Sequence, residues 1–428
     1  MTTRANYSDL VAKAFAILLL FLSTSALIQL LLYPTGATGS YDPVEGNPVS
    51  QVVWLGLYGI TFVLILRRWQ QFVNFATIDK FLLVLVGITL CSVIWSAAPD
   101  VTLRRNVALA GTTMIGIYLA MRYSLSELLR LLAWAMGLAA LLSLAFAVAL
   151  PSYGIDNYSV AGDWQGIYGG GKNVLGRNMS LGALVFLLLA LSVRRYRWLT
   201  WAGFGVSIAV LLASDSVTSW TTLLIVAGLL LPYAALRWRY TLALPCLLAA
   251  LVVVGIAGLW LQGIVDDLLI ELGRDPTLTG RTEIWPAVLE MIKERPWLGY
   301  GYGGFWLGWE GESASIWHWT SHQSVHAHNG FLELWLNLGL LGLSTFVLGF
   351  MVAVGRAIIW ARMTKTAEGL WPLAYLTFML LYNLTEVSIL VRNSIFWILY
   401  VVIVVAMAAQ LSGVRDARWL APEYRGVP

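Results

Sequence analysis

All four histidines of this 428-residue chain, His318, His322, His326 and His328, lie within eleven residues. A metal site, a general base and a polar surface are the three alternatives for such a cluster. Metal sites usually combine closely spaced His or Cys with carboxylate or thiolate ligands. Here His326 and His328 alternate along an extended or turn segment, without a neighbouring Cys or an HExxH pattern. Neutral imidazole suits proton abstraction near neutral pH, so the pattern favours one histidine as a general base.

His328 has the most informative surroundings, because it begins the run HNGFLELWLNLGLLG. Asn329 and Gly330 are start signals for a helix, and apolar residues then continue for more than twenty positions. We therefore expect His328 at the rim of the membrane, where a spanning helix begins. Glu333 lies little more than one turn inside that helix. Acids within a membrane are functional candidates by default, so Glu333 is either a buried partner for a basic residue or a polar contact for a sugar.

Arg281 is a second candidate, in the upstream segment TGRTEIWPAVLEMIKERPW. Apolar residues at helical spacing predict an amphipathic helix over 283–294 that lies on the membrane surface, and Pro286 is tolerated in its first turn. Arg281 precedes this helix, where unpaired backbone N–H groups and a guanidinium form a natural anion site. The alternative is a solvated charge, or one paired with Glu283. The GYGYGG that follows does not match a phosphate-binding P-loop and is interpreted as a structural turn.

Four further basic residues stand at the ends of apolar segments. Arg104 and Arg105 follow WSAAPD, and Lys172 and Arg177 lie in GGGKNVLGRN. Arg177 falls one turn inside the hydrophobic boundary, which is costly unless the side chain faces a polar cavity or a partner. Arginines at such positions suggest recognition of a negatively charged group. A lipid-linked diphosphate fits, because its charge lies at the headgroup level while its tail stays in the bilayer.

Transmembrane helices are the elements that must position these residues. The chain is 59% apolar and only 12% charged, with a mean hydropathy of +0.75, whereas soluble domains carry about a quarter charged residues. This composition excludes a water-soluble enzyme and a disordered chain. It also excludes a nucleic-acid-binding domain, because no Lys/Arg run is long enough to follow a phosphate backbone. We therefore predict an all-α integral membrane protein.

Twelve segments approach the roughly 20 apolar residues that a spanning helix needs. They cover residues 14–33, 51–67, 81–96, 106–122, 131–150, 174–193, 198–213, 217–236, 241–262, 330–355, 370–390 and 394–412. The first nine spans occupy residues 1–262. A long structured loop with the amphipathic helix follows over 263–329, and the last three spans and a terminal tail make up 330–428.

Charge fixes the expected orientation of these spans. If both termini and every second loop are cytoplasmic, 18 of the 27 Lys and Arg residues fall on that side, but only 6 of the 23 Asp and Glu residues do. The positive-inside rule therefore predicts cytoplasmic termini. The 263–329 loop, with all four histidines, is then expected on the opposite, outer face.

A family resemblance rests on these same residues. His328-Asn329, nine residues, Gly339, two residues and Gly342 match the O-antigen ligase signature of His, then Asn, Ser or Gln, nine residues, Gly, two residues, then Gly, Thr or Tyr. The segments GRTEIW, ERPWLGYGYGGF, WSAAPDVTLRR, SDSVTS and NLTEVS resemble ExoQ-like exopolysaccharide polymerases. The chain is thus similar to the O-antigen ligase and polymerase (Wzy-C) superfamily over about 90–400, most strongly over 279–343.

The resemblance implies a metal-independent, inverting glycosyltransferase of the membrane-embedded C type in the bacterial inner membrane, without a cofactor. Its donor is an undecaprenyl-diphosphate-linked oligosaccharide on the periplasmic side, and its other partners are an acceptor glycan, the bilayer and a chain-length regulator. By this resemblance His328 is the catalytic base. Arg281 and Arg177 bind the diphosphate, and Arg105 or Arg104 is a further diphosphate-binding residue. Lys172 is a further candidate for the diphosphate, and the expected supporting residues are Asn329, Glu333, His326 and Glu386 of NLTEVS.

Polymerase and ligase differ only in the acceptor, which is another lipid-linked repeat unit or the lipid A core. The local sequences GYGYGGFW and HAHNGFLELW favour a polymerase. A transporter or flippase is the alternative from another class. Transporters often show two similar halves and ionisable groups in mid-membrane. Residues 1–214 and 215–428 show no convincing repeat, and the intramembrane charges cluster at the outer ends, so an enzyme is favoured.

Overall fold

The computed structural model describes residues 2–27, 48–155, 162–168, 171–237, 281–320 and 323–413. Within these ranges the chain is helical, and its single extended pairing is an isolated bridge between Ile155 and Trp164. The all-α prediction is confirmed for this part of the chain. The predicted span 241–262, residues 28–33 of the first span, loop residues 263–280, His322 and the tail 414–428 lie outside the described residues.

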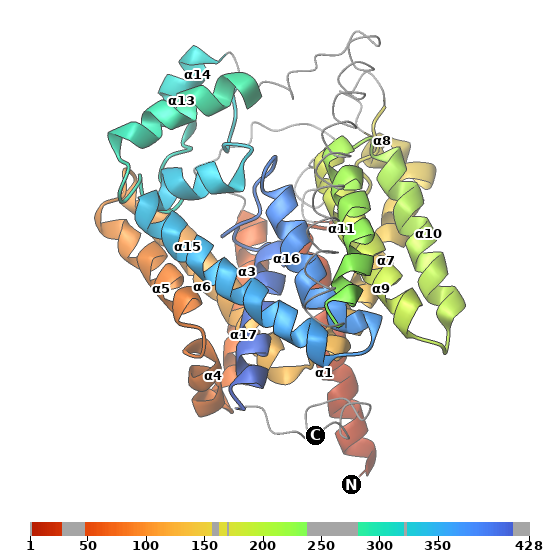
Figure 1. Ribbon diagram of the computed structural model, residues 1–428. Helices are drawn as coiled ribbons and strands as arrows, with labels where there is room; N and C mark the ends of the chain where they lie inside the picture. The colour runs from red at the N-terminus through yellow and green to blue at the C-terminus, as the bar shows by residue number, and fades with distance from the viewer. Residues whose placement is uncertain are drawn as a thin grey trace.

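The helices follow one another along the chain as shown in Figure 1. They are α1 (Thr2–Ser23), α3 (Pro48–Leu66), α4 (Trp69–Ala76), α5 (Lys80–Cys91), η1 (Ser92–Ile94), α6 (Pro99–Arg122), α7 (Leu125–Ala149), α8 (Pro151–Gly154), α9 (Lys172–Ser192), α10 (Arg197–Ala213), α11 (Val217–Ala235), α13 (Arg281–Glu294), η2 (Gly308–Glu310), α14 (Ser313–Trp319), α15 (Gly330–Met363), η3 (Ala367–Leu370), α16 (Trp371–Tyr382) and α17 (Ile395–Leu411). The short helices α13 and α14 lie at the end of the molecule opposite to the start of α1.

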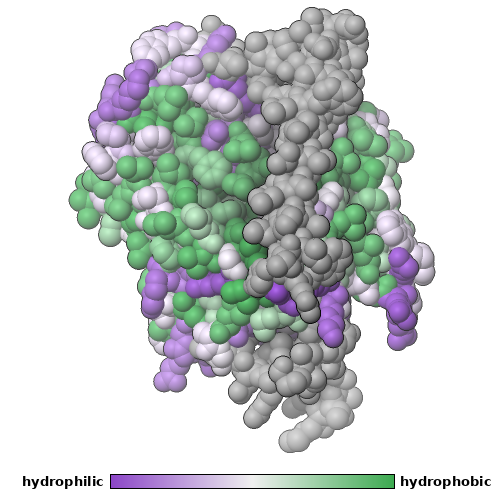
Figure 2. Space-filling view, in the orientation of Figure 1, coloured by the Kyte–Doolittle hydropathy of each residue, from purple (hydrophilic) through white to green (hydrophobic). Residues whose placement is uncertain are grey.

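Five described helices, α3, α7, α9, α11 and α15, are long and apolar enough to cross a membrane. A sixth span is available if α4 and α5 are taken together, although they are bent by 93° and equally fit a re-entrant loop. Figure 2 shows a broad apolar band between two polar zones on the visible face. These features are those of a multi-pass membrane protein. The number of twelve spans stays a prediction.

Helix α17 forms the centre of the described bundle. Every residue from 395 to 409 is buried, as expected for a helix that is apolar on all sides. It packs against α6 and α15, and the Trp397 indole donates to the Thr113 hydroxyl at 2.9 Å. Gly116 lets α6 approach closely, because a Cβ there would lie 2.8 Å from Val401. This central helix provides the fixed support for the segment that precedes it.

The predicted span 370–390 is shorter in the structure, because α16 ends at Tyr382. The Asn383 side chain accepts hydrogen bonds from the backbone N–H groups of Ser388 (2.8 Å) and Ile389 (3.2 Å). These bonds close a polar turn that a continuing helix could not contain. Part of the predicted span is therefore a loop between α16 and α17. Similarly, the helix in the predicted span 81–96 ends at Cys91.

Helix α15 is interrupted at Gly339, whose φ of +64° is left-handed. The chain around the predicted GYGYGG turn lies against this interruption: the Leu340 N–H donates to the carbonyl of Pro296, just before the turn, at 2.8 Å, and the N–H of Tyr300, within the turn, donates to the Leu336 carbonyl at 2.9 Å. A Cβ at position 339 would overlap the Trp297 carbonyl and the Leu298 nitrogen. Gly339 of the ligase signature is therefore needed for backbone conformation and for close approach.

We expect Gly339→Ala to destabilise the protein by several kcal/mol, because both the left-handed φ and the overlap with Trp297 are unfavourable. Gly355→Ala on the same helix is the matched control, since a Cβ there meets nothing within 4 Å. That control should change stability by less than about 1 kcal/mol. Thermal unfolding of both variants in detergent makes the comparison. Equal melting temperatures would show that the interruption is not required.

Candidate active site

The segment that carries His328 is held at the beginning of α15. The Asn329 side chain caps the helix by accepting from the N–H groups of Phe331 (3.0 Å) and Leu332 (3.1 Å), which confirms the predicted helix start. Its amide donates to the Leu384 carbonyl at 3.1 Å, and the Gly330 N–H donates to the Asn383 carbonyl at 2.8 Å. The start of α15 is therefore joined to the loop between α16 and α17.

Glu333 supports the same segment from inside the first turn of α15. Its carboxylate accepts from the Ala327 N–H at 2.9 Å, from the Trp306 indole at 2.9 Å and from the Asn337 amide at 2.8 Å. These hydrogen-bond donors are neutral, unlike the basic partner that was one of the two expectations, and the sugar contact stays a prediction. Glu333 fixes the backbone one residue before His328.

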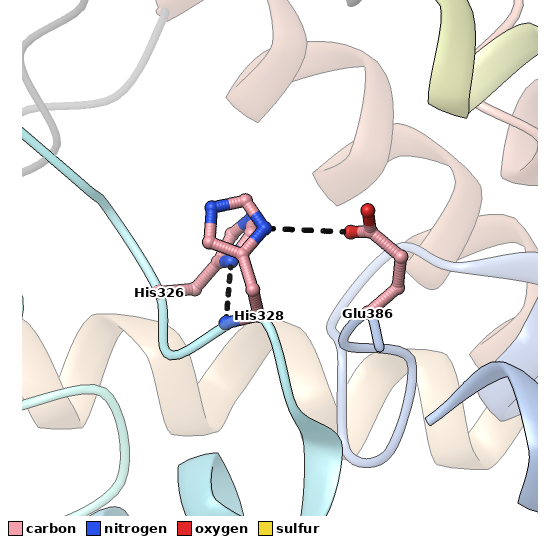
Figure 3. Close-up of side chains that lie close together, drawn as sticks. All are labelled: His326, His328 and Glu386. Atoms are coloured by element: carbon pink, nitrogen blue, oxygen red, sulfur yellow. Dashed lines mark hydrogen bonds and ion pairs between the residues drawn. The ribbon is translucent and has the colours of Figure 1, made fainter. Parts of the chain in front are cut away.

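Figure 3 shows the side chains of His326, His328 and Glu386 gathered at one point. The His328 Nδ1 atom lies 3.8 Å from Glu386 Oε2. The backbone N–H of His328 donates to His326 Nδ1 at 3.2 Å. The two imidazole rings are 4.1 Å apart between centroids. His328 has a φ of +49°, an uncommon conformation for a non-glycine residue that recurs at functional sites.

Arg281 reaches the same carboxylate from the first residue of α13. Its Nη2 atom lies 2.8 Å from Glu386 Oε1, with only 6% of the Arg281 side chain and 9% of the Glu386 side chain exposed. Sequence reasoning considered a solvated Arg281 or a pair with Glu283, and the partner found here is Glu386, 105 residues away. The ion pair joins α13 to the loop between α16 and α17.

Arg177, on α9, supplies a second positive charge near the cluster. Its guanidinium lies over the Phe396 ring, 5.4 Å from the centroid. The Nε atoms of Arg177 and Arg281 and the Nδ1 atom of His328 are buried without a hydrogen-bond partner among the described residues. Buried polar atoms normally have partners. The two unused guanidinium N–H groups, beside a single carboxylate, suit an anionic ligand.

His326 is neutral in this environment at neutral pH. Burial lowers the pKa of its imidazole to about 4, and the positive charges of Arg177 and Arg281 act in the same direction. Its Nδ1 atom therefore remains an acceptor for the backbone N–H of His328. The structure thus gives His326 a role in fixing His328.

The low pKa of His326 predicts a pH-dependent stability. The unfolded imidazole titrates near 6.5 and the folded one at about 4, so stability should fall as the pH drops from about 6.5 to about 4, by at most about 1.4 kcal/mol per pH unit. His326→Asn, which keeps an acceptor but does not titrate there, should lose less stability over this window. Unfolding measured in detergent from pH 7 to pH 4 tests this. The exposed His318 gives the control His318→Asn, and identical curves for both variants would contradict the prediction.

The other predicted anion-binding residues lie in different surroundings. Lys172 forms ion pairs with Asp163 at 3.2 Å and Asp215 at 3.7 Å. Arg105 donates to the Gly303 carbonyl in the GYGYGG turn between α13 and η2, and Arg104 is exposed on α6. The structure therefore brings together His328, His326, Glu386, Arg281 and Arg177, but gives Lys172 and Arg105 other partners.

A metal site was one alternative for the histidine cluster, and the structure adds the Glu386 carboxylate to it, which the spacing of the histidines could not reveal. Ligand atoms of His326, His328 and Glu386 lie within 4.8 Å of one another. However, Glu386 already faces the Arg281 guanidinium, whose charge would repel a cation at the same oxygens. The electrostatics of the cluster fit an anion better than a metal ion.

Sequence reasoning missed Asn173, which stands between two singled-out residues in GGGKNVLGRN. Its amide donates to Glu386 Oε1 at 3.0 Å, across 213 residues of sequence. Its position beside Lys172 was the only available signal, and nothing local indicated its partner.

Comparison with known proteins now adds to this geometry. Residues 202–347 match the family model described as O-antigen ligase. The resemblance predicted from the sequence is confirmed. The matched range includes Arg281, His328 and Glu333. The chain is also 29% identical over 304 residues to the exopolysaccharide production protein ExoQ of Rhizobium meliloti (strain 1021), covering 69% of this chain and 68% of that relative.

Proposed function

We propose that this protein is an inner-membrane glycosyltransferase that transfers a glycan from an undecaprenyl-diphosphate donor to a sugar hydroxyl on the periplasmic face. The observation that carries the proposal is the cluster of His328, Glu386 and Arg281, with a second guanidinium from Arg177 nearby. It combines a candidate base with unused donors for an anionic leaving group.

His328 is the proposed general base. The side of its ring that bears Nδ1 faces Glu386, which favours a proton on Nδ1 and leaves the Nε2 lone pair free to accept the proton of the acceptor hydroxyl. The hydroxyl oxygen then bonds to the anomeric carbon of the donor sugar. The bond from that carbon to the diphosphate oxygen breaks, and its electron pair stays with the diphosphate. A single displacement of this kind inverts the anomeric carbon.

Arg281 and Arg177 are the proposed binding groups for the diphosphate. Negative charge grows on the leaving oxygen as the bond breaks, and donors that are already oriented stabilise it without reorganisation. Arg281 begins α13, so backbone N–H groups of the first turn add to the positive potential. The predicted participation of Lys172, Arg104 and Arg105 is not included in this site, because Lys172 and Arg105 have other partners and Arg104 is exposed.

An apolar groove near the cluster supports a lipid-linked donor. It has a volume of about 380 Å³ and begins at Phe331, three residues after His328. Leu380 of α16 contributes to its lining. The other lining residues lie on α15, and they are Phe346, Val347, Phe350, Met351 and Val354. Isoprenoid units in this groove would gain from burial of apolar surface while the diphosphate stays at the level of Arg281.

We propose a repeat-unit polymerase as the specific activity, with a second lipid-linked glycan as acceptor. Similarity to a protein named for exopolysaccharide production favours this choice. The alternative is an O-antigen ligase that uses the lipid A core, which the description of the matching family model favours. The proposed topology has twelve spans, cytoplasmic termini and α13 and α14 in the periplasm, where a chain-length regulator has access.

Purified protein in proteoliposomes with a lipid-diphosphate-linked repeat unit tests the proposal. Lengthening of the lipid-linked glycan supports a polymerase, and transfer to a lipid A core acceptor supports a ligase. Movement of the donor across the bilayer without any transfer would establish the transporter alternative. In cells, deletion should abolish the secreted polymer; normal polymer with uncapped lipopolysaccharide would indicate the ligase.

We expect glycan transfer to continue at an unchanged rate after exhaustive chelation of divalent cations. The reason is that Arg281 already neutralises Glu386, and Arg281 and Arg177 take the place of a metal at the leaving group. Initial rates with and without EDTA, at constant ionic strength, provide the measurement. Loss of activity that returns on addition of Mg²⁺, Mn²⁺ or Zn²⁺ would instead assign a catalytic ion to His326, His328 and Glu386.

A further inference from the structure

We infer that Asn173 is a positioning residue that fixes the rotation of the Glu386 carboxylate against His328. The inference rests on the proposed glycosyl transfer, in which Asn173 acts through its hydrogen bond to Glu386. It concerns a residue that acts through Glu386, from the first turn of α9.

Two donors converge on one oxygen of Glu386. The Asn173 amide lies 3.0 Å from Oε1, and the Arg281 guanidinium lies 2.8 Å from the same atom. The other oxygen, Oε2, is left facing His328 Nδ1 at 3.8 Å. Because both donors hold Oε1, the plane of the carboxylate and the direction of Oε2 are determined.

The amide of Asn173 is itself oriented by a hydrogen bond from Ser216. The Ser216 hydroxyl donates to Asn173 Oδ1 at 3.0 Å and lies 2.8 Å from the Ser219 hydroxyl. An ionised carboxylate only accepts hydrogen bonds, so the NH₂ group of Asn173 must face Glu386 and its oxygen must face Ser216. A polar chain therefore runs from Ser219 through Ser216 and Asn173 to Glu386, and it ends at His328.

This chain explains the SDSVTS turn, which the proposed reaction does not otherwise use. The turn lies directly against α9 at Gly176, where a Cβ would come within 2.5 Å of the Ser216 Cβ and 2.8 Å of the Ser219 Oγ. Lys172 adds an ion pair to Asp215 of the turn at 3.7 Å. Asn173 is thus held where α9 packs against α11. This contact does not involve the loop that carries Glu386.

The arrangement matters most when the donor is bound. Arg281 then serves both Glu386 and the diphosphate, and a guanidinium drawn towards the diphosphate would loosen its hold on Oε1. Asn173 has no proposed role in diphosphate binding, so its hydrogen bond to Oε1 keeps Glu386 Oε2 directed at His328 throughout the reaction. Its loss should therefore lower kcat, while the donor KM, set by Arg281 and Arg177, changes little.

Asn173→Ala and Asn173→Asp test the inference in the proteoliposome assay. A lost hydrogen bond to a charged group corresponds to a decrease in kcat of about 10- to 100-fold for Asn173→Ala, with the donor KM within about 3-fold. Asn173→Asp has nearly the same shape but directs a second carboxylate at Glu386, so its kcat should be lower still. A purely structural role for Asn173 predicts the opposite order.

Asn178→Ala is the matched control, because Asn178 is a fully buried amide on the same helix that donates to the Thr24 and Val174 carbonyls instead. Its kcat per folded molecule should stay within about 2-fold of wild type. In a Glu386→Gln background, Asn173→Ala should have little further effect on kcat. Equal kcat for wild type and Asn173→Ala, or an Asp variant more active than the Ala variant, would overturn the inference.

Failure of the proposed function is separately visible as the absence of transfer by the wild-type protein. In that event cryo-electron microscopy of the wild type and Asn173→Asp decides the positioning role. The Glu386 carboxylate should rotate away from His328 in the variant, while residues 383–389 stay in place through Asn383. An unmoved carboxylate contradicts the inference whatever the reaction is.

Discussion

Replacement of His328 by alanine is expected to lower the rate of glycan transfer by about 10²- to 10⁴-fold, the usual contribution of a general base. His328→Asn should be equally inactive, and asparagine tolerates the left-handed φ of +49° at this position better than alanine does. The Asn variant therefore separates loss of the base from loss of the local backbone. Rates are measured on protein that elutes as a single species and melts as wild type does.

The control for His328 is His318→Ala, in the same loop of sequence but exposed on α14. It should transfer glycan at the wild-type rate. Near wild-type activity in either His328 variant would remove the proposed base, and His326 would be the next residue to test, because its neutral ring lies beside His328.

Arg281→Ala should have the largest combined effect on stability and transfer. It leaves the buried Glu386 carboxylate without its guanidinium, and breaking a buried ion pair in this way costs about 3–5 kcal/mol. It also removes a proposed diphosphate ligand, so the donor KM should rise and kcat should fall. Unfolding in detergent and steady-state kinetics measure the two consequences.

The double variant Arg281→Ala/Glu386→Gln separates these consequences, because it removes both charges together. Stability should return towards wild type, while transfer should not. Recovery of transfer in the double variant would mean that Arg281 serves only to neutralise Glu386. Arg295→Ala is the matched control, since its pair with Glu312 spans 3.4 Å and is 42% and 38% exposed; it should change stability by less than about 1 kcal/mol.

Local sequence signals predicted the helices better than their ends. The Asn329 cap and the helix after it followed from residue types within one turn, and the segment 283–294 falls within α13. The end of α16 did not follow, because apolar residues recur after Tyr382 at Leu384, Val387 and Ile389, while the Asn383 side chain helps to close a turn there. An average of hydropathy over a window does not register which side-chain hydrogen bonds end a helix.

The candidate site shows the same limit. His328 and Arg281 could be chosen because an imidazole or a guanidinium at a helix start has a recognisable chemistry. Their common partner Glu386 entered only through the resemblance of NLTEVS, and Asn173 was not found at all. Contacts across 105 and 213 residues are decided by helix packing, which leaves no periodic trace in the sequence.

The wide separation of these partners along the chain has a consequence for biogenesis. Glu386 follows α16, so an inserting chain that has not yet emerged past this loop holds His328 and Arg281 without the carboxylate that joins them. Chains stalled after α15 should therefore be inert towards the donor, and the protein should become active only when its last described helix, α17, is in place. The proposed reaction would then be withheld until the helices that carry and support Glu386 have inserted.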